Sequence, residues 1–219
     1  MQLVIGNKNY SSWSMRPWIL LRHFEISFEE IRIPLFTEGY EIELSRYSPT
    51  LKVPVLLDGE NRIWDSLAIL EYVSEKYLKG LALPKDLNTR ALCRSYCSEM
   101  HAGFMEIRSQ MPMNCRARKE IEFTPEVLTQ CKRLDQLWAE ARSRHCSRGS
   151  YLFGDFSLAD CMFAPMAMRF RTYGVKISDT SQAYLDFLLE NPAILQWQES
   201  ASKELEILPD YEIGLDLSL

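Results

Sequence analysis

The chain has 219 residues, of which 47% are hydrophobic and 25% charged, values typical of a globular protein with one or two domains. Its formal net charge of −5 argues against a surface dedicated to nucleic acid. No stretch approaches the ~20 apolar residues of a membrane-spanning helix, and the first residues lack the layout of a signal peptide. We therefore expect a cytoplasmic protein with neither a nucleic-acid nor a membrane partner.

The first eighty residues alternate between the sequence patterns of strands and helices. Apolar runs and polar–apolar alternation mark the strands, the Asp58-Gly59 pair marks a hairpin turn, and apolar residues at helical spacing mark the helices. The predicted elements are a strand (3–5), a helix (15–24), a strand (29–35), a short helix (39–47), a two-stranded hairpin (53–66) and a helix (67–77). This βαβ-ββα order predicts an α/β domain over residues 1–80, with helices packed against a mixed sheet.

After Leu83-Pro84 the strand patterns nearly vanish and long helical patterns follow. Helices are predicted over residues 88–111, 125–144, 158–173, 182–189 and 192–205. The change in pattern places a domain boundary within residues 80–87 and predicts an all-helical second domain over residues 88–219.

The start of one of these helices is marked by a capping pair. Ser157 precedes the helix and Asp160 follows three residues later, so each side chain is placed to bond the other's backbone. The segment after Ser157 is apolar nearly all round, which predicts a helix buried at the centre of the second domain. We therefore expect Ser157 and Asp160 to be structural residues.

The six cysteines lie on helix-like segments of a chain without an export signal, so we expect reduced thiols. Cys93, Cys97 and His101 fall on one helical face, but a zinc site there would need a fourth ligand. Small apolar residues on the inner face of a helix explain the spacing better, and no metal is expected.

Four motifs, spread over essentially the whole chain, resemble the glutathione transferase family in their order and spacing. They are the turn YSSWSMRPW, the segment SPTLKVPVL, the helix start DSLAILEYV and the segment GDFSLADCMFAP. The turn is most similar to that of the zeta-like and related bacterial serine-type members, which read Ser-Ser-x-Ser followed by an arginine. The resemblance implies a thioredoxin-like first domain, a helical-bundle second domain and glutathione as co-substrate.

The resemblance implies that residues of two motifs bind glutathione. Ser66 opens a helix, so its main-chain N–H and hydroxyl are placed to hold the γ-glutamyl carboxylate, and Asp65 is placed near the ammonium group. Without the resemblance, Asp65 and Ser66 read as a helix cap. In the family the bond corresponding to Val53-Pro54 is cis, and the valine backbone pairs with the cysteinyl part of glutathione as an added strand. Lys52 is placed to approach the glycine carboxylate, although a solvated lysine is an alternative.

The serine-rich turn is expected to hold the sulfur of glutathione. Alignment with the Ser-Ser-x-Ser pattern makes Ser11 the hydroxyl that donates to the thiolate and Ser12 a neighbouring contact. Ser12 and Tyr10 are the alternatives for the donor, and Ser14 is expected to cap the following helix. Zeta-type members carry a cysteine where this chain has Trp13, which argues against glutaredoxin-like thiol chemistry.

The second substrate is expected between the domains, against the helix that follows residue 100. Met105, Arg108, Met111 and Met113 are the candidate wall beside Trp13, with plain core packing as the alternative for the methionines. Arg169 and Arg171 follow the buried helix, but neither stands at the family's offset for a carboxylate-binding arginine, so no such role is carried over. His101 is expected to be an ordinary helix histidine.

The resemblance implies a detoxification enzyme: a glutathione transferase in which the bound thiolate attacks an electrophilic, largely apolar small molecule. Conjugation, dehalogenation and isomerisation of the maleylacetoacetate type are the reactions it implies, and a homodimer is expected. The alternative is a non-catalytic binding or regulatory protein of the same fold. A glutathione-dependent oxidoreductase is disfavoured because no cysteine precedes Cys93.

Overall fold

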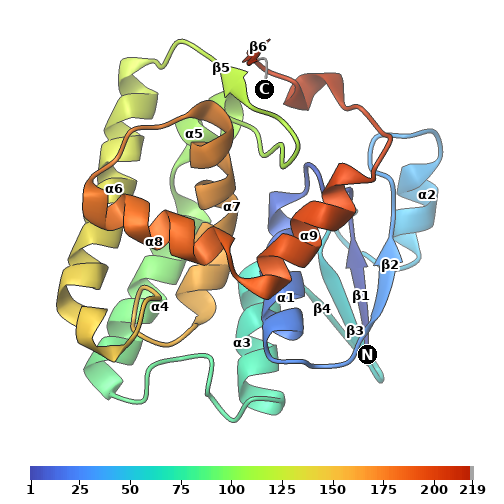
Figure 1. Cartoon of the computed structure of the whole chain (residues 1–219). Coiled ribbons are helices and arrows are strands. Elements are labelled where there is room, and N and C mark those ends of the chain that lie inside the picture. Colours follow the sequence, from blue (N-terminus) through green and yellow to red (C-terminus); the bar gives the residue numbers. More distant parts are fainter. Residues whose placement is uncertain (218–219) are drawn as a thin grey trace.

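The computed structural model describes residues 1–217, and its N-terminal domain is a four-stranded mixed sheet with helices on it (Figure 1). The strand order is β2-β1-β3-β4, with β1 parallel to β2 and the other neighbours antiparallel. The elements are β1 (Gln2–Ile5), α1 (Ser12–His23), β2 (Glu29–Arg32), α2 (Tyr40–Ser45), β3 (Val55–Asp58), β4 (Asn61–Trp64) and α3 (Ser66–Lys76). The predicted order of elements is confirmed.

Alternation along β1 gives this sheet two covered faces, because successive side chains of a strand point to opposite sides. Leu3 and Ile5 belong to the main hydrophobic core together with residues of α1 and α3. Val4 belongs to a smaller cluster on the other side, with Val55 of β3 and Leu44 of α2. Both faces therefore exclude water, which fixes the register of the central strands.

The second part of the chain is mainly helical, and its longest helix is α6 (Figure 1). It is not all-helical as predicted, because it also contains a short two-stranded sheet. The elements are α4 (Leu87–Ala102), α5 (Met105–Gln110), β5 (Lys119–Glu120), α6 (Pro125–His145), the 3-10 turn η1 (Cys146–Arg148), α7 (Leu158–Tyr173), α8 (Asp179–Leu189), α9 (Pro192–Ser202), the 3-10 turn η2 (Pro209–Tyr211) and β6 (Leu215–Asp216). Across residues 1–217, every helix is too short or too polar to cross a bilayer.

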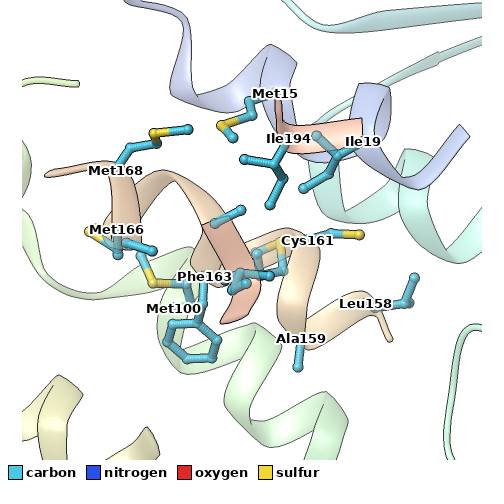
Figure 2. Close-up of a cluster of buried hydrophobic side chains, with 14 of the residues drawn as sticks. Met15, Ile19, Met100, Leu158, Ala159, Cys161, Phe163, Met166, Met168 and Ile194 are labelled. Carbon is cyan, nitrogen blue, oxygen red and sulfur yellow. The ribbon is translucent and has the colours of Figure 1, made fainter. Parts of the chain in front are cut away.

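The predicted central helix is α7, and it joins the two domains through a continuous core. Figure 2 shows its side chains, Phe163 and Met166 among them, in one cluster with Met15 of α1 and Met100 of α4. These four side chains are fully buried. At the start of α7 the predicted capping box between Ser157 and Asp160 is present. Because α1 follows the serine-rich turn directly, this packing holds the turn against the helical domain.

The helix predicted over residues 88–111 is interrupted. Gly103 is extended and Phe104 is left-handed (φ 64°), so α4 ends at Ala102 and α5 begins at Met105. The side chain of Arg108 donates to the carbonyls of Gly103 and Met100, which the break would otherwise leave without partners. The interruption therefore fixes the position of the Arg108 guanidinium.

The predicted helix 15–24 begins earlier than expected, at Ser12, with Ser11 as its N-cap residue. Ser14 lies inside the helix and accepts a hydrogen bond from the Gly6 main-chain N–H, so the prediction that Ser14 caps α1 is wrong. Apolar periodicity becomes visible only from Met15 onwards, because the first turn of α1 carries serines.

The C-terminal segment after α9 returns to the N-terminal domain, which the sequence patterns did not predict. The predicted helix 192–205 ends at Ser202. The carboxylate of Glu204 then accepts from the main-chain N–H groups of Lys8 (2.7 Å) and Asn9 (2.9 Å). Further on, β6 pairs with β5 of the helical domain. The segment therefore lies over the loop that leads into the serine-rich turn.

Candidate active site

The serine-rich turn connects β1 to α1 and is closed by main-chain hydrogen bonds. The carbonyl of Asn7 accepts from the N–H groups of Tyr10 (3.2 Å) and Ser11 (2.8 Å). Helix α1 starts immediately after Ser11, so the positive end of its dipole lies at the turn. This arrangement favours an anion beside the turn.

The serine hydroxyls of the turn have different partners. Ser11 Oγ donates to Ser14 Oγ (2.7 Å), and Ser14 Oγ also accepts from the main-chain N–H of Gly6 (3.1 Å). Ser12 Oγ accepts from Nη2 of Arg169 (3.2 Å), a residue of α7 in the helical domain. The bond from Arg169 leaves the proton of the Ser12 hydroxyl available for another acceptor.

The hydroxyl of Tyr10 is engaged by the C-terminal segment and its neighbours. It donates to Glu212 Oε1 (2.6 Å) and accepts from Nη2 of Arg116 (3.0 Å). Burial, and next the hydrogen bond with Glu212, raises the pKa of Tyr10. The proton of Tyr10 is therefore committed to a carboxylate.

A second wall of the site is formed by the segment before β3. The Val53-Pro54 peptide bond is cis. Within residues 1–217, the main-chain N–H and carbonyl of Val53 have no hydrogen-bond partner. The exposed Lys52 precedes them, and its own N–H donates to Ser48 Oγ (3.1 Å). The backbone of Val53 is thus left with a free donor and a free acceptor.

The third wall is the start of α3, where Asp65 is the N-cap residue. Its Oδ1 accepts from the N–H groups of Leu67 (2.8 Å) and Ala68 (3.3 Å), and its Oδ2 lies 3.1 Å from Nε2 of His101. Asp65 has a φ of 74°, a conformation that costs a residue with a side chain about 1–3 kcal/mol. Such strain is concentrated at functional sites. Within residues 1–217, the first N–H of α3, that of Ser66, has no acceptor.

These three walls enclose one cavity of about 810 Å³ between the domains. Ten of the residues that the sequence singled out line it, namely Tyr10, Ser11, Ser12, Trp13, Lys52, Val53, Pro54, Asp65, Ser66 and Arg108. The volume is that of a site for a small-molecule ligand. Segments more than fifty residues apart in the chain therefore meet at one place.

Several residues of the cavity wall were not predicted as site residues. They are Asn7, Leu35, Phe36, Tyr40, Thr50, Leu51, Trp64, Pro112, Arg169, Leu208 and Tyr211. Arg169 carried a signal in the sequence, since it is the first of two arginines that follow the long apolar run of α7. Leu208 and Tyr211 carried none, because the C-terminal segment has no pattern that indicates where it folds back.

Three guanidinium groups gather around Trp13. Those of Arg16 and Arg108 lie 4.3 Å and 4.8 Å from the centre of the Trp13 ring, and that of Arg169 contacts the adjacent Ser12. None of the three forms an ion pair with a carboxylate of residues 1–217. Burial lowers the pKa of Arg108 to about 10 and that of Arg169 to about 9. The cavity floor is therefore positively charged.

The methionines predicted for the second-substrate wall do not line the cavity. Met105 is 61% exposed on α5, whereas Met111 and Met113 are fully buried in the hydrophobic core. Met105 opens α5, whereas Met111 and Met113 follow the end of α5 at Gln110, so these residues do not share one helical face. Of the predicted wall, Trp13 and Arg108 remain.

The alternative metal site on α4 has no support in the geometry. Cys93 and Cys97 are buried free thiols. In the part of the chain that the structure describes, no three His, Cys, Asp or Glu side chains are grouped to hold a metal ion.

Comparison with known proteins identifies the family. The model of the glutathione S-transferase N-terminal domain matches residues 10–76, and that of the C-terminal domain matches residues 116–199. Together the two matches span more than half of the chain, and the protein therefore belongs to the glutathione S-transferase family. Residues 10–76 contain the serine-rich turn, Val53-Pro54 and the start of α3.

Among curated proteins the chain is similar to a maleylacetoacetate isomerase, a zeta-class glutathione S-transferase and a dehalogenase. It is 28% identical over 173 residues to probable maleylacetoacetate isomerase 2 of Drosophila melanogaster, covering 76% of this chain and 74% of that protein. It is 37% identical over 83 residues to a zeta-class glutathione S-transferase of Euphorbia esula, covering 37% of each chain. A dichloromethane dehalogenase of Methylophilus leisingeri is 59% identical over 54 residues, which cover 24% of this chain and 20% of that protein.

Solved structures confirm the fold. A Burkholderia glutathione transferase homologue with bound glutathione superposes with a TM-score of 0.67 and 23% identity, over 93% of this chain and 98% of that chain. A bacterial zeta-class maleyl pyruvate isomerase superposes with a TM-score of 0.68 and 20% identity, over 92% of this chain and 98% of that chain.

Proposed function

We propose that the protein is a glutathione transferase that binds glutathione as thiolate and directs it at a small electrophile. The observation that carries the proposal is the meeting of the serine-rich turn, Val53-Pro54 and the start of α3 in one cavity. Each wall offers groups that bind one part of glutathione. The serine-rich turn offers a hydroxyl and the N-terminus of α1 to the sulfur, and Val53 offers a main-chain N–H and carbonyl to the peptide. The start of α3 offers a helix N-terminus to a carboxylate.

Glutathione would lie along the N-terminal domain in an extended conformation. The γ-glutamyl carboxylate would accept from the N–H and hydroxyl of Ser66, with its ammonium group near the partly exposed Asp65. The cysteinyl main chain would pair with Val53, whose N–H and carbonyl have no partner within residues 1–217. Lys52 would then meet the glycine carboxylate as a flexible point charge.

Ser11 is the donor to the sulfur in this proposal. A free thiol with a pKa near 8.5 is only ~3% ionised at pH 7, and lowering that pKa by two units takes about 2.7 kcal/mol. A hydrogen bond to a charged group supplies ~1.5–3 kcal/mol. The Ser11 hydroxyl can rotate toward the sulfur, while Ser14, held by the N–H of Gly6, takes over the donation to Ser11 Oγ.

Ser12 is the alternative donor, and Tyr10 is the third. The bond from Arg169 to Ser12 Oγ places a positive charge behind a hydroxyl whose proton has no acceptor within residues 1–217. The proton of Tyr10 is held by Glu212, which makes it the least available of the three. No general base is needed in any of these cases, because the hydroxyl donates to an anion and is not itself the nucleophile.

The electrophile would sit at the end of the cavity beside Trp13. Trp13, Pro112, Leu208 and Tyr211 supply apolar and aromatic surface there, and Arg108 supplies a cation. Conjugation, dehalogenation and cis–trans isomerisation all start with attack by the same thiolate. The relatives named as isomerases and as a dehalogenase support this range of reactions. The family resemblance also supports a cytoplasmic homodimer with a role in detoxification.

The proposal predicts binding and turnover with glutathione. Calorimetric titration with glutathione should give saturable binding, and a screen of dinitro-aryl halides, haloalkanes, peroxides and maleyl compounds should find at least one glutathione-dependent reaction. Absence of binding at millimolar glutathione would contradict the proposal and favour a non-catalytic protein of this fold.

A further inference from the structure

The carboxylate of Glu212 joins the C-terminal segment to the serine-rich turn. Its Oε1 accepts from the hydroxyl of Tyr10 (2.6 Å) and from Nδ2 of Asn114 (2.9 Å). Its Oε2 lies 3.2 Å from Nζ of Lys119. Tyr10, Asn114 and Lys119 are all buried. Because hydrogen bonds to an ionised group are stronger than those between neutral groups, one carboxylate holds the segment at three points.

The partners of Glu212 are fixed by contacts of their own. Oδ1 of Asn114 accepts from Nδ2 of Asn9 (3.0 Å), and the hydroxyl of Thr172 in α7 contacts the carbonyl of Asn114 (2.9 Å). Lys119 lies in β5. The rest of the protein therefore sets the anchoring points, and Glu212 fixes the C-terminal segment against them.

The segment that Glu212 holds supplies part of the cavity wall. It runs from α9 to β6, beside β5 (Figure 1), and Leu208 and Tyr211 on it line the cavity. The ring centre of Tyr211 lies 5.4 Å from that of Tyr10 and 6.2 Å from that of Phe36, two further residues of the wall. Aromatic rings pack favourably at such distances. The wall next to the serine-rich turn is therefore aromatic, and its outer ring directly precedes Glu212 in the chain.

We propose that Glu212 is a positioning residue for the electrophile. It holds the C-terminal segment so that the ring of Tyr211 packs against an aromatic group carried on the sulfur of glutathione. The role rests on the proposed function, which places glutathione in the cavity. The residues assigned there to glutathione all precede residue 67, so they lie outside the segment that Glu212 holds. Glu212 therefore acts on an aromatic electrophile and not on glutathione itself.

Two ligands that differ only in the group on the sulfur test this role. S-methylglutathione carries a methyl group there, and S-benzylglutathione carries an aromatic ring. Calorimetry should show that Glu212→Ala weakens binding of S-benzylglutathione about fivefold or more, because the benzyl ring loses its aromatic partner. The same substitution should weaken binding of S-methylglutathione less than about twofold, because the contacts of glutathione are independent of the segment.

A matched control and a conservative variant accompany Glu212→Ala. Asp210→Ala removes the same charge from an exposed residue of the same segment, outside the cavity and without an ion pair in residues 1–217, so both affinities should stay unchanged. Glu212→Gln keeps an oxygen that accepts from Tyr10 and Asn114. It should therefore restore most of the affinity for S-benzylglutathione.

Tyr211→Leu separates the ring from the residue that holds it. The substitution removes the ring and leaves the contacts of Glu212 in place, so it should weaken binding of S-benzylglutathione and spare S-methylglutathione. Hydrogen exchange of the main-chain amides in residues 204–217 measures how the segment is held without any ligand. Exchange should be faster in Glu212→Ala than in Asp210→Ala.

Equal weakening of both ligands by Glu212→Ala, or an unchanged affinity for S-benzylglutathione, would overturn the positioning role and leave the proposed function intact. Unchanged hydrogen exchange in Glu212→Ala would likewise overturn it, because the segment would then be held without Glu212. Failure of the wild-type protein to bind either ligand would overturn the proposed function, and this role with it.

Discussion

Replacing Ser11 with alanine is expected to raise the pKa of the thiol of bound glutathione by about one to two units. The expectation follows because a hydrogen bond to an anion contributes ~1.5–3 kcal/mol and one pKa unit corresponds to ~1.4 kcal/mol. At pH 7 the thiolate fraction, and with it kcat/KM, should fall about 3- to 25-fold, because the pKa rises from about 6.5 to about 7.5–8.5. Ultraviolet absorbance of the thiolate against pH, and kcat/KM against pH, measure both effects.

Ser12→Ala is the matched comparison, because Ser12 is the neighbouring residue with a free hydroxyl proton. Under the Ser11 account it should shift the thiol pKa less than Ser11→Ala does. A larger shift in Ser12→Ala would transfer the donor role to Ser12 and to the arginine behind it. Unchanged absorbance in both variants would show that neither serine activates the sulfur.

Asp160→Ala is expected to lower the free energy of unfolding by about 3–5 kcal/mol, since it leaves several buried donors without an acceptor. Asp160 is fully buried. Its Oδ1 accepts from Leu152 N–H (3.0 Å) and Tyr184 hydroxyl (3.1 Å), and its Oδ2 from the N–H (2.8 Å) and hydroxyl (2.9 Å) of Ser157. Chemical denaturation, monitored by tryptophan fluorescence, measures the loss.

Asp155→Ala is the control for this prediction, because Asp155 is an exposed carboxylate close by in the chain and forms no ion pair within residues 1–217. Its effect should stay within about 0.5 kcal/mol. Tyr184→Phe removes one of the four donors and should cost about 1 kcal/mol. A loss in Asp160→Ala no larger than in Asp155→Ala would show that the capping network does not stabilise α7.

Much of the fold was predictable because burial of one face of a strand or helix produces a periodic pattern of apolar residues in the sequence. Alternation in the strands and helical spacing in 67–77 follow from faces that exclude water, and the capping pair at Ser157 marks the start of α7. The break at Phe104 was not predictable from periodicity. It depends on the Arg108 side chain reaching back to two carbonyls, an interaction without a sequence pattern.

The candidate site was predictable mainly in its N-terminal half, and Arg108 is the predicted residue of the helical domain that lines the cavity. Ser11, Val53 and Ser66 stand in local motifs, so the sequence places each beside a turn or a helix start. The residues that complete the site, Arg169 and Tyr211, come from a buried helix and from the returning C-terminal segment. Their position depends on how the two domains pack, which local patterns do not encode.

The hydrogen bond from Arg16 to Ser66 shows the same division. The sequence identifies an arginine after the serine-rich turn and a serine at the start of α3, fifty residues apart. Only the packing of α1 against α3 brings the guanidinium to the hydroxyl. An arginine of one motif therefore contacts a serine of another, which neither motif predicts alone.

The most direct test of thiol activation is the pKa of glutathione's thiol in complex with the wild-type protein. Difference spectroscopy of the complex over pH 5–9, with S-methylglutathione as the reference that cannot ionise at sulfur, measures it. Thiolate absorbance should rise with a pKa about two units below the ~8.5 of a free thiol. Saturable binding of glutathione with an unshifted thiol pKa would contradict the account.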